Sequence, residues 1–415
     1  MGYTFIEKLV KRNIQADSVK AGDIVTVQVD RVMIHDIFIP FVAEKFEEMG
    51  FSKLWDPDRV VLIYDHLVPA SQVDDVRHFK IGDAFAEKYG LKNVHRSDGI
   101  CHQLMTEALY VKPGNVVFGT DSHTTTYGCV GAFSSGIGYT EMASILGTGT
   151  MWIKVPETIK VNIEGNLPAN VSSKDIILRL IGDLGADGAT YRALEFTGNT
   201  VENMSISSRM TIANMAIEAG AKCALFTPDE KTAEYCQISL TDEDRDLKSD
   251  TDATYFKVME YKAEDFVPVM ACPSQVDNIK PVSELQGTKI DQVFIGSCTN
   301  GRLEDLAVAA EILKGKQVSP FVKLIVTPAS RKVFTEAAQQ GIIKTLTEAG
   351  AIVTHPGCGL CCGRTGGILS DGERVVATNN RNFLGRMGTS KVEIYLASPA
   401  SAAAAAVTGE ITLPY

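Results

Sequence analysis

Three cysteines in two glycine-rich stretches carry the clearest chemical signal in the chain. Cys358 and Cys361 form a C-x-x-C pair among glycines, and Cys298 follows the apolar run 293–295 in a second loop rich in Gly, Ser and Asn. Glycine lets the backbone pass close to a metal centre while two thiolates point at it. A strand that ends in such a loop is where α/β proteins place reactive groups. The pattern favours a metal centre held by these thiolates.

The number of cysteines decides what kind of centre this would be. Three thiolates on a four-iron cluster leave one iron free for water or substrate, as a Lewis acid requires, whereas an electron-transfer cluster normally has four protein ligands. Cys362 is the only nearby fourth candidate, and two adjacent cysteines cannot easily both reach one small cluster. From the spacing alone, a thioredoxin-like redox pair and a structural zinc half-site remain open.

Histidines and carboxylates form a second chemical signal. Two short apolar runs lead directly into Asp65 with His66 and into Asp121 with His123, so both pairs are expected at the carboxyl edge of a sheet. Histidine carries protons near neutral pH, and a neighbouring carboxylate can hold its charged form. By themselves, such pairs are more often strand ends without a chemical role, and His102 is more often a core or capping residue.

Residues 296–300 and 356–361 resemble the two cluster-binding signatures of the aconitase superfamily, and the similarity extends along nearly the whole chain. The chain is most similar to the large subunits of the two-chain members, namely 3-isopropylmalate dehydratase, homoaconitase and dimethylmalate dehydratase. The resemblance implies one 4Fe-4S cluster per chain, with the three cysteines as its metal ligands. The family does not usually have cysteine at position 362, and we expect Cys362 to be a buried bystander.

The resemblance also implies catalytic roles. In the family, the histidine that matches His66, backed by Asp65, handles the leaving hydroxyl, and the histidine that matches His102 pairs with a distant glutamate, here Glu218. A further aspartate and histidine lie beside the open iron. The implied catalytic set is therefore Asp65, His66, His102, Asp121, His123 and Glu218.

Arg381 and Arg386 lie five residues apart in a Gly/Asn-rich loop. Guanidinium groups can bind carboxylates two hydrogen bonds at a time. Without further information these would be surface arginines, but residues 380–386 match the family's Asn-Arg-Asn-Phe-x-Gly-Arg motif, which implies a substrate clamp. His35 lies in an early loop where relatives carry a similar His-Asp pair, and we expect it to be peripheral. The substrate-binding set implied by the resemblance is Ser122, Asn214, Asn300, Asn380, Arg381 and Arg386; within it, Asn214 is a cluster-side residue.

Composition excludes several classes of protein. The formal net charge of −11 speaks against nucleic-acid binding, which requires a basic face. Nine scattered cysteines without a disulfide framework, together with the expected cluster, predict a reducing cytoplasm. The N-terminus lacks the pattern of a signal peptide, and no apolar run reaches membrane-spanning length. We expect a soluble cytoplasmic protein with no nucleic-acid or membrane partner.

The chain of 415 residues is long enough for several domains, and strands alternate with helices. We expect an α/β protein with three α/β domains of the aconitase type packed around the cluster. The first, 1–159, carries the Asp-His and Asp-Ser-His loops, the second is 160–285, and the third, 286–415, carries the cluster cysteines. The swivelling fourth domain of the one-chain members is expected to be absent.

Shorter patterns predict the elements that carry these residues. A helix over 209–218 would place Asn214 and Glu218 four apart on one face, and 173–175 begins another helix. The glycine-rich run 128–138 resembles a dinucleotide-binding loop. No acidic residue follows it at the right place, so close helix packing is the better interpretation.

The sequence thus predicts the large catalytic subunit of a 4Fe-4S-dependent hydro-lyase that acts on a small hydroxy-dicarboxylate or tricarboxylate. The first expectation for the substrate is 3-isopropylmalate/2-isopropylmalate of leucine biosynthesis. The alternatives are homoaconitate and 2,3-dimethylmalate or citramalate, and the rival class is a non-catalytic iron–sulfur protein. In one-chain aconitases the base is a serine on the fourth domain. Because this chain stops soon after the third, we expect a separate small subunit carrying the swivelling domain.

Overall fold

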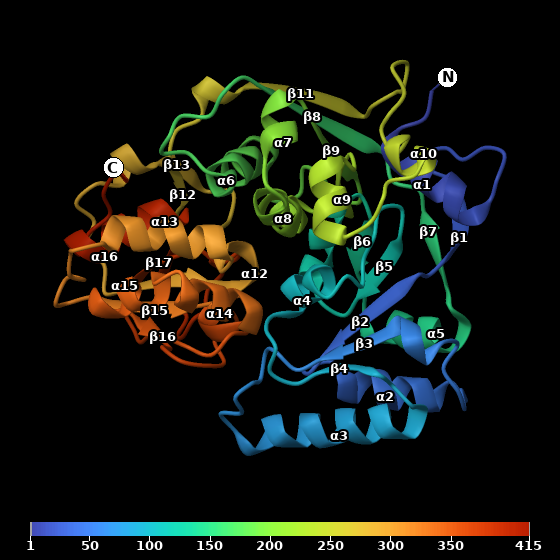
Figure 1. Ribbon diagram of the computed structural model, residues 1–415, viewed down its shortest axis with the longest axis horizontal. Coiled ribbons are helices and arrows are strands. Elements are labelled where there is room, and N and C mark those ends of the chain that lie inside the picture. Colours follow the sequence, from blue (N-terminus) through green and yellow to red (C-terminus); the bar gives the residue numbers. More distant parts are fainter. Residues whose placement is uncertain (1, 415) are drawn as a thin grey trace.

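The computed structural model describes residues 2–414, and its main elements are three β-sheets with helices around them (Figure 1). In Figure 1 the N-terminus and first helix lie at the upper right, the following helices and strands at the bottom, the middle of the chain at the top centre, and the C-terminal third at the left. This architecture confirms the α/β class predicted from the sequence. None of the helices among residues 2–414 is long and apolar enough to cross a membrane.

The first sheet has five strands in the order β4-β3-β2-β5-β6, and all neighbouring strands are parallel. Each residue of β3 and β5 is buried, as expected for continuous apolar strands covered on both faces. An antiparallel ribbon of β1 and β7 lies beside it. The bounds are α1 Phe5–Ile14, β1 Ile24–Gln28, β2 Arg31–His35, α2 Ile39–Glu48, η1 Pro57–Arg59, β3 Val60–Ile63, α3 Val73–Tyr89, β4 Asn93–His95, α4 Cys101–Glu107, β5 Val116–Gly119, η2 Ser122–Val130, β6 Phe133–Gly136, α5 Tyr139–Thr148 and β7 Thr150–Lys154.

The second sheet has four parallel strands in the order β10-β9-β8-β11. Helix α6 begins at Ser173, as predicted, because Ser172 and Asp175 form a capping box at its N-terminus. The predicted helix over 209–218 is shorter: α8 ends at Met215 and continues as a 3-10 turn, which Gly220 closes in a left-handed conformation. The bounds are β8 Thr158–Glu164, α6 Ser173–Leu184, β9 Ala193–Thr197, α7 Asn199–Asn203, α8 Ile206–Met215, η3 Ala216–Ala219, β10 Cys223–Phe226, α9 Glu230–Cys236, α10 Asp242–Arg245, β11 Lys257–Lys262 and η4 Ala263–Asp265.

The third sheet has seven strands in the order β13-β12-β18-β17-β14-β15-β16. Strands β18 to β16 in that order are parallel, and β12 and β13 add an antiparallel edge. The bounds are β12 Val269–Ala271, β13 Ile279–Pro281, α11 Val282–Leu285, β14 Gln292–Gly296, α12 Ser297–Asn300, α13 Leu303–Leu313, β15 Lys323–Thr327, α14 Arg331–Gln339, α15 Ile342–Glu348, β16 Ile352–Val353, η5 Gly359–Cys362, β17 Arg374–Ala377, β18 Glu393–Leu396 and α16 Pro399–Thr408.

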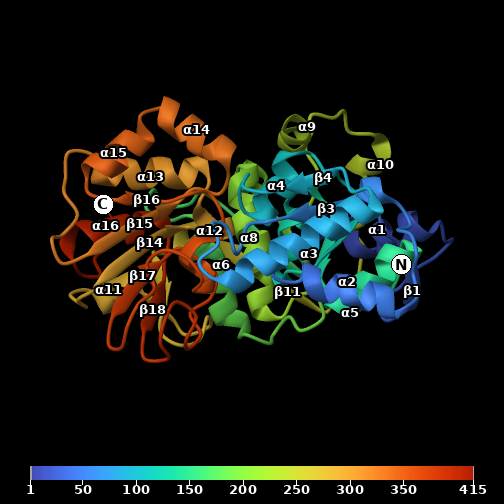
Figure 2. The same cartoon turned by 90° about the horizontal axis from the view of Figure 1, so that it is seen from below.

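The first and third sheets meet through the loops that carry the predicted chemistry. The backbone N–H of Cys358 donates to the carbonyl of Asp65 at 3.0 Å, and that of Arg331 donates to Asp98 at 2.7 Å. One apolar core cluster contains residues from all three sheets. Figure 2 shows α6 and α8 between the third sheet and the elements of the first. The carboxyl ends of strands from two sheets therefore meet at one place, where ligands commonly bind in α/β proteins.

Candidate active site

The loop that carries Cys298 is held in a fixed shape. Strand β14 ends at Gly296, and Ser297 follows with a φ of 72°, a left-handed conformation that is rare for residues with a side chain. The guanidinium of Arg302, which is buried, donates to the carbonyls of Cys298 and Thr299 and to the hydroxyl of Thr211. These hydrogen bonds link the loop to helix α8 and so fix the direction of the Cys298 thiol.

The C-x-x-C pair lies on the tight turn η5. Gly359 has a φ of 60°, and a Cβ at this position would lie 2.7 Å from the Thr327 hydroxyl oxygen. Only glycine therefore fits the turn without a shift. Cys358 and Cys361 are both buried. A hydrogen bond from Cys358 and the charge of Arg386 hold the pKa of the Cys361 thiol well below its usual value, although burial opposes them.

The groups around the sulfurs fit a centre held by thiolates. The Cys298 sulfur accepts from the side-chain amides of Asn214 at 3.2 Å and Asn380 at 3.5 Å, and the Arg386 guanidinium lies 3.7 Å from the Cys361 sulfur. Donors aimed at sulfur stabilise the anionic form that binds iron. Burial, aided by the charge of Cys361, raises the pKa of Cys298 to about 11 although Asn214 donates to its sulfur, so the thiol needs a further positive charge, such as a metal, to ionise near neutral pH.

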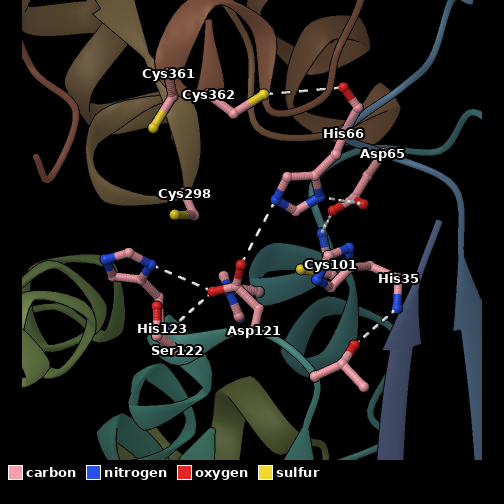
Figure 3. Close-up of polar contacts among 12 residues, drawn as sticks. His35, Asp65, His66, Cys101, Asp121, Ser122, His123, Cys298, Cys361 and Cys362 are labelled. Atoms are coloured by element: carbon pink, nitrogen blue, oxygen red, sulfur yellow. Dashed lines mark hydrogen bonds and ion pairs between the residues drawn. The ribbon is translucent and has the colours of Figure 1, made fainter. Parts of the chain in front are cut away.

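Cys362 does not lie where the sequence predicted it. It is only half-buried, its sulfur lies 4.0 Å from the His66 carbonyl oxygen, and it forms part of a cavity wall. Adjacent side chains of the η5 turn point in different directions: the Cys361 sulfur lies 3.6 Å from Asn380 Oδ1, whereas the Cys362 sulfur points toward the His66 carbonyl (Figure 3). The expectation of a buried bystander is therefore wrong as to burial.

His66 and Asp65 form a closely coupled pair. The His66 Nδ1 lies 2.7 Å from one carboxylate oxygen of Asp65, and the second oxygen accepts the backbone N–H of Cys101 at 2.7 Å. Asp36 accepts the backbone N–H groups of Asp65, His66 and Leu67 and so holds their loop. Burial would lower the pKa of His66, but the charge of Asp65 and the hydrogen bonds with Asp121 and Asp65 together outweigh it and raise that pKa well above its usual value. These carboxylates therefore favour the protonated form of His66.

Asp121 is the centre of the histidine cluster. Its carboxylate lies 2.9 Å from His102 Nε2, 3.2 Å from His123 Nδ1 and 3.6 Å from His66 Nε2. Burial would raise the pKa of Asp121, but the hydrogen bonds of the three histidines hold it well below its usual value. The carboxylate is thus an anion that orients three imidazoles toward one space.

Glu218 has a different partner from the one predicted. Its carboxylate oxygen lies 2.8 Å from His123 Nε2 and accepts from Arg381 Nε at 2.9 Å, whereas His102 contacts Asp121 and the Tyr127 hydroxyl. The predicted His102–Glu218 pair is therefore wrong. The reason is that the end of α8 and the turn η3 pack against η2, which carries His123.

Six of the predicted site residues line a cavity of about 510 Å³, namely His66, Asp121, Ser122, His123, Arg381 and Arg386. Figure 3 shows Cys361 and Cys362 at the top, Cys298 below them, His66 to the right, and Asp121 and His123 at the bottom. The Arg381 guanidinium also donates to the Ser122 hydroxyl at 3.0 Å, so the clamp loop reaches across to the first sheet. The chemically active residues of the cavity wall are His35, His66, Asp121, Ser122, His123, Cys362, Arg381 and Arg386.

Three predicted substrate-binding asparagines do not line the cavity. Asn214 and Asn380 both donate to the Cys298 sulfur, and the Asn380 amide also donates to the Asn214 side-chain oxygen at 3.1 Å. Asn300 donates to Asp305 at 2.9 Å and is buried behind the Cys298 loop. The structure therefore places the first two beside the metal ligands and does not bring Asn300 to the substrate space.

His35 was expected to be peripheral, and this is wrong. Its ring stacks on His66 with the ring centroids 4.4 Å apart, it is buried, and neither ring nitrogen has a hydrogen-bond partner. It lies at the end of β2, the strand between β3 and β5. Strands β3 and β5 end in the Asp65-His66 and Asp121 to His123 motifs. The His-Asp pair at the end of β2 could therefore have been predicted to lie at the same site.

Two groups of histidines and carboxylates, within residues 2–414, are close enough to hold a single metal ion. The first contains His35, Asp36, Asp65 and His66, and the second contains His102, Asp121 and His123, each with ligand atoms within 4.8 Å of one another. Asp36 and Asp121 already accept several hydrogen bonds. The three cysteine thiols are better suited to bind a metal, because amide and guanidinium groups around them can stabilise their anionic form.

Comparison with known proteins adds independent evidence. The family model described as "Aconitase family (aconitate hydratase)" matches residues 7–286 and 275–409. The chain is 48% identical over 415 residues to "3-isopropylmalate dehydratase large subunit 1" of Methanopyrus kandleri, which covers 100% of this chain and 99% of the relative. It is 43% identical over 413 residues to "Probable methanogen homoaconitase large subunit" of Methanothermobacter thermautotrophicus, covering 98% of this chain and 96% of the relative.

Among solved structures, the chain is similar to aconitase X of Thermococcus kodakaraensis in its holo-form. The TM-score is 0.51 at 14% identity, and the match covers 86% of this chain and 84% of that one. At this identity the likeness supports the fold and carries no information about the reaction.

Proposed function

The chain belongs to the aconitase family as a dehydratase large subunit, and from this premise we propose that it holds a 4Fe-4S cluster and interconverts 2-isopropylmalate and 3-isopropylmalate. The observation that carries the proposal is the convergence of three buried cysteines with a His/Asp/Arg cavity. An electron-transfer protein would need neither the two arginines nor the ionised histidine pair.

The cluster would be held by Cys298, Cys358 and Cys361. When bound, it supplies a Lewis acid at the iron that has no protein thiolate. Asn214 and Asn380 would donate to the Cys298 sulfur and keep its orientation. Cys362 would remain free in the cavity wall.

The protein side of the reaction uses groups with opposite charges. His66, protonated because of Asp65, donates its Nε2 proton to the departing hydroxyl. Asp121 and His123 orient the substrate and the released water. Arg381 binds one carboxylate of the substrate through the guanidinium nitrogens that face the cavity.

The name of the relative at 48% identity supports 3-isopropylmalate as the substrate. The relative at 43% identity, named as a probable homoaconitase large subunit, makes homoaconitate the second candidate. These substrates share the hydroxy-acid part and differ in a side group. The cavity wall offers Ile37, Phe38 and Ile137 to an apolar side group, which favours the isopropyl substituent over a further carboxylate.

A small subunit would complete the site. Dehydration needs a base for the carbon-bound proton, and each histidine of the cavity, apart from His35, already has a carboxylate partner. Apolar side chains are exposed next to the cavity: Phe383 and Leu384 beside the arginines are 46% and 66% exposed, and the exposed rings of Phe41 and Tyr139 contact Phe38 of the cavity wall. A partner that covers these side chains would also exclude water from the reaction.

The test is turnover by the anaerobically purified chain with its cluster intact, with and without the small subunit. The substrate panel contains 3-isopropylmalate, homocitrate, 2,3-dimethylmalate and citramalate. We expect no turnover by the chain alone and a preference for 3-isopropylmalate by the complex. Full turnover by the chain alone would refute the need for a partner, and preference for homocitrate would support the second candidate.

A further inference from the structure

Lys174 is a fully buried lysine in a place that the reaction described above does not explain. It is the second residue of α6, its exposed fraction is 0%, and its side chain points from the second sheet's helices toward the third sheet. No carboxylate within 4.0 Å pairs with it in the described part of the chain, residues 2–414. Lysine is almost never fully buried unless it has a partner.

The partners of Lys174 are two consecutive backbone carbonyls. Its Nζ donates to the carbonyl of Thr378 at 2.7 Å and to that of Asn379 at 2.6 Å. These residues follow β17 and immediately precede Asn380 and Arg381. The ammonium therefore fixes the start of the loop that places one amide on the Cys298 sulfur and one guanidinium in the cavity.

Thr378 extends this connection to the first cysteine loop. Its hydroxyl oxygen accepts the backbone N–H of Gly296 at 2.9 Å, and Gly296 stands two residues before Cys298. Lys174 is thus connected to the loop of Cys298 through one residue, Thr378. The other carbonyl that it binds belongs to the residue two positions before Arg381. The Lys174 side chain therefore connects the Cys298 loop and the Arg381 loop to helix α6, which belongs to the helices of the second sheet.

The surroundings of Lys174 are matched to negative charge on the thiols. Burial lowers the pKa of Lys174 to about 7, and the groups that oppose this are Asp305, Cys361, Cys298 and Asp175, in that order. Two of these four are proposed cluster ligands. When those cysteines are thiolates, they supply negative charge that favours the ammonium form.

We propose that Lys174 is a positioning residue of the site: its buried side-chain nitrogen holds the carbonyls of Thr378 and Asn379 and so sets Asn380 and Arg381 beside the cysteine-held centre. This inference rests on the proposed function. It differs from the roles of the arginines because Lys174 acts through the backbone of the loop and through charge. It does not touch the substrate space, since it is absent from the cavity wall.

Two variants separate the clamp from the charge. Lys174→Met keeps nearly the same length and removes the donors and the charge, whereas Lys174→Gln removes the charge but keeps an amide donor on a side chain that is one atom shorter. The control is Lys222→Met, which neutralises a half-buried lysine directly before β10 of the second sheet, with its Nζ over the Tyr191 ring. All are reconstituted anaerobically as the full chain, and the reduction potential of the cluster is measured by EPR-monitored titration before any substrate is added.

We expect a more negative reduction potential in both Lys174 variants and an unchanged potential in the control, because loss of a nearby positive charge disfavours the reduced cluster. With the small subunit present, the KM of Lys174→Met should rise at least about tenfold, since two charge-assisted hydrogen bonds of the loop are lost, and Lys174→Gln should restore part of the loss.

A potential and a KM that match the parent in both variants would overturn the inference while leaving the proposed function intact. If Lys174→Met does not fold, Lys174→Gln decides alone, and an unchanged potential and KM in that variant overturn the inference. A parent chain that binds a cluster but turns over no hydroxy-acid refutes the proposed function instead, and the potentials still test Lys174.

Discussion

Asp65→Asn tests how the ionised histidine is produced. In the parent, one carboxylate oxygen of Asp65 accepts from His66 and the other accepts the backbone N–H of Cys101, both at 2.7 Å. Asparagine has a single acceptor oxygen, so one of these two buried donors loses its partner. An unpartnered buried donor costs about 1–3 kcal/mol, which corresponds to a decrease in kcat of roughly 5- to 150-fold if His66 is the group affected.

The same variant changes the pH profile in a known direction. The folded-state pKa of His66 is raised, chiefly by Asp65 against the effect of burial. The active, protonated form is therefore present at low and neutral pH and is lost as the pH rises through the folded-state pKa. Without the carboxylate charge this loss begins at lower pH, so the alkaline limb of the kcat profile should move to lower pH in Asp65→Asn.

The assay is kcat of the reconstituted complex as a function of pH. Asp75→Asn is the matched control, because Asp75 is also buried but binds only Ser71 and Gln72, through one oxygen. Asp75→Asn should leave both kcat and the position of the alkaline limb of the pH profile unchanged. An alkaline limb at the parental position in Asp65→Asn, with full iron content, would refute the assignment of the proton to His66.

Five further variants extend the test. Cys361→Ser should lose the visible iron–sulfur absorbance after anaerobic reconstitution and Cys362→Ser should keep it; the reverse result would exchange the ligand assignment. His66→Asn should lower kcat by roughly 10²–10⁴-fold at unchanged iron content, and unchanged turnover would remove it from the mechanism. Arg381→Lys should raise the KM by roughly tenfold or more, because lysine cannot replace the planar fork; a parental KM would contradict the clamp. The pKa of Asp121 is lowered from its usual 3.8, so its stabilisation is present above that value and lost as pH falls, and the melting temperature of Asp121→Asn should depend less on acid pH than that of the parent.

The sequence predicted the site best where the functional residues are neighbours in the sequence and directly follow a strand. The cysteine loops, the Asp65-His66 pair and the Asp121 to His123 loop follow apolar strands, and parallel strands bring their carboxyl ends to one edge whatever the details of packing. The structure therefore places them together as expected. His35 could have been found by the same rule, since it ends the strand between the other two.

Contacts between residues that are far apart in the sequence could not be predicted from such strand-end motifs. Glu218 pairs with His123 across 95 positions, and Lys174 reaches Thr378 across 204. Either histidine, His102 or His123, satisfies the sequence pattern equally well as a partner for Glu218. The choice depends on how η3 packs against η2, and that is a property of the assembled core.

The central claim is that this chain presents an iron–sulfur cluster directly to a hydroxy-acid. The most direct measurement is the EPR spectrum of the reduced, anaerobically reconstituted chain, recorded with and without 3-isopropylmalate. We expect the spectrum to change when the acid is added, because the iron without a protein thiolate exchanges its ligand. A spectrum that is the same with every hydroxy-acid of the panel would contradict the claim and would favour a non-catalytic iron–sulfur protein.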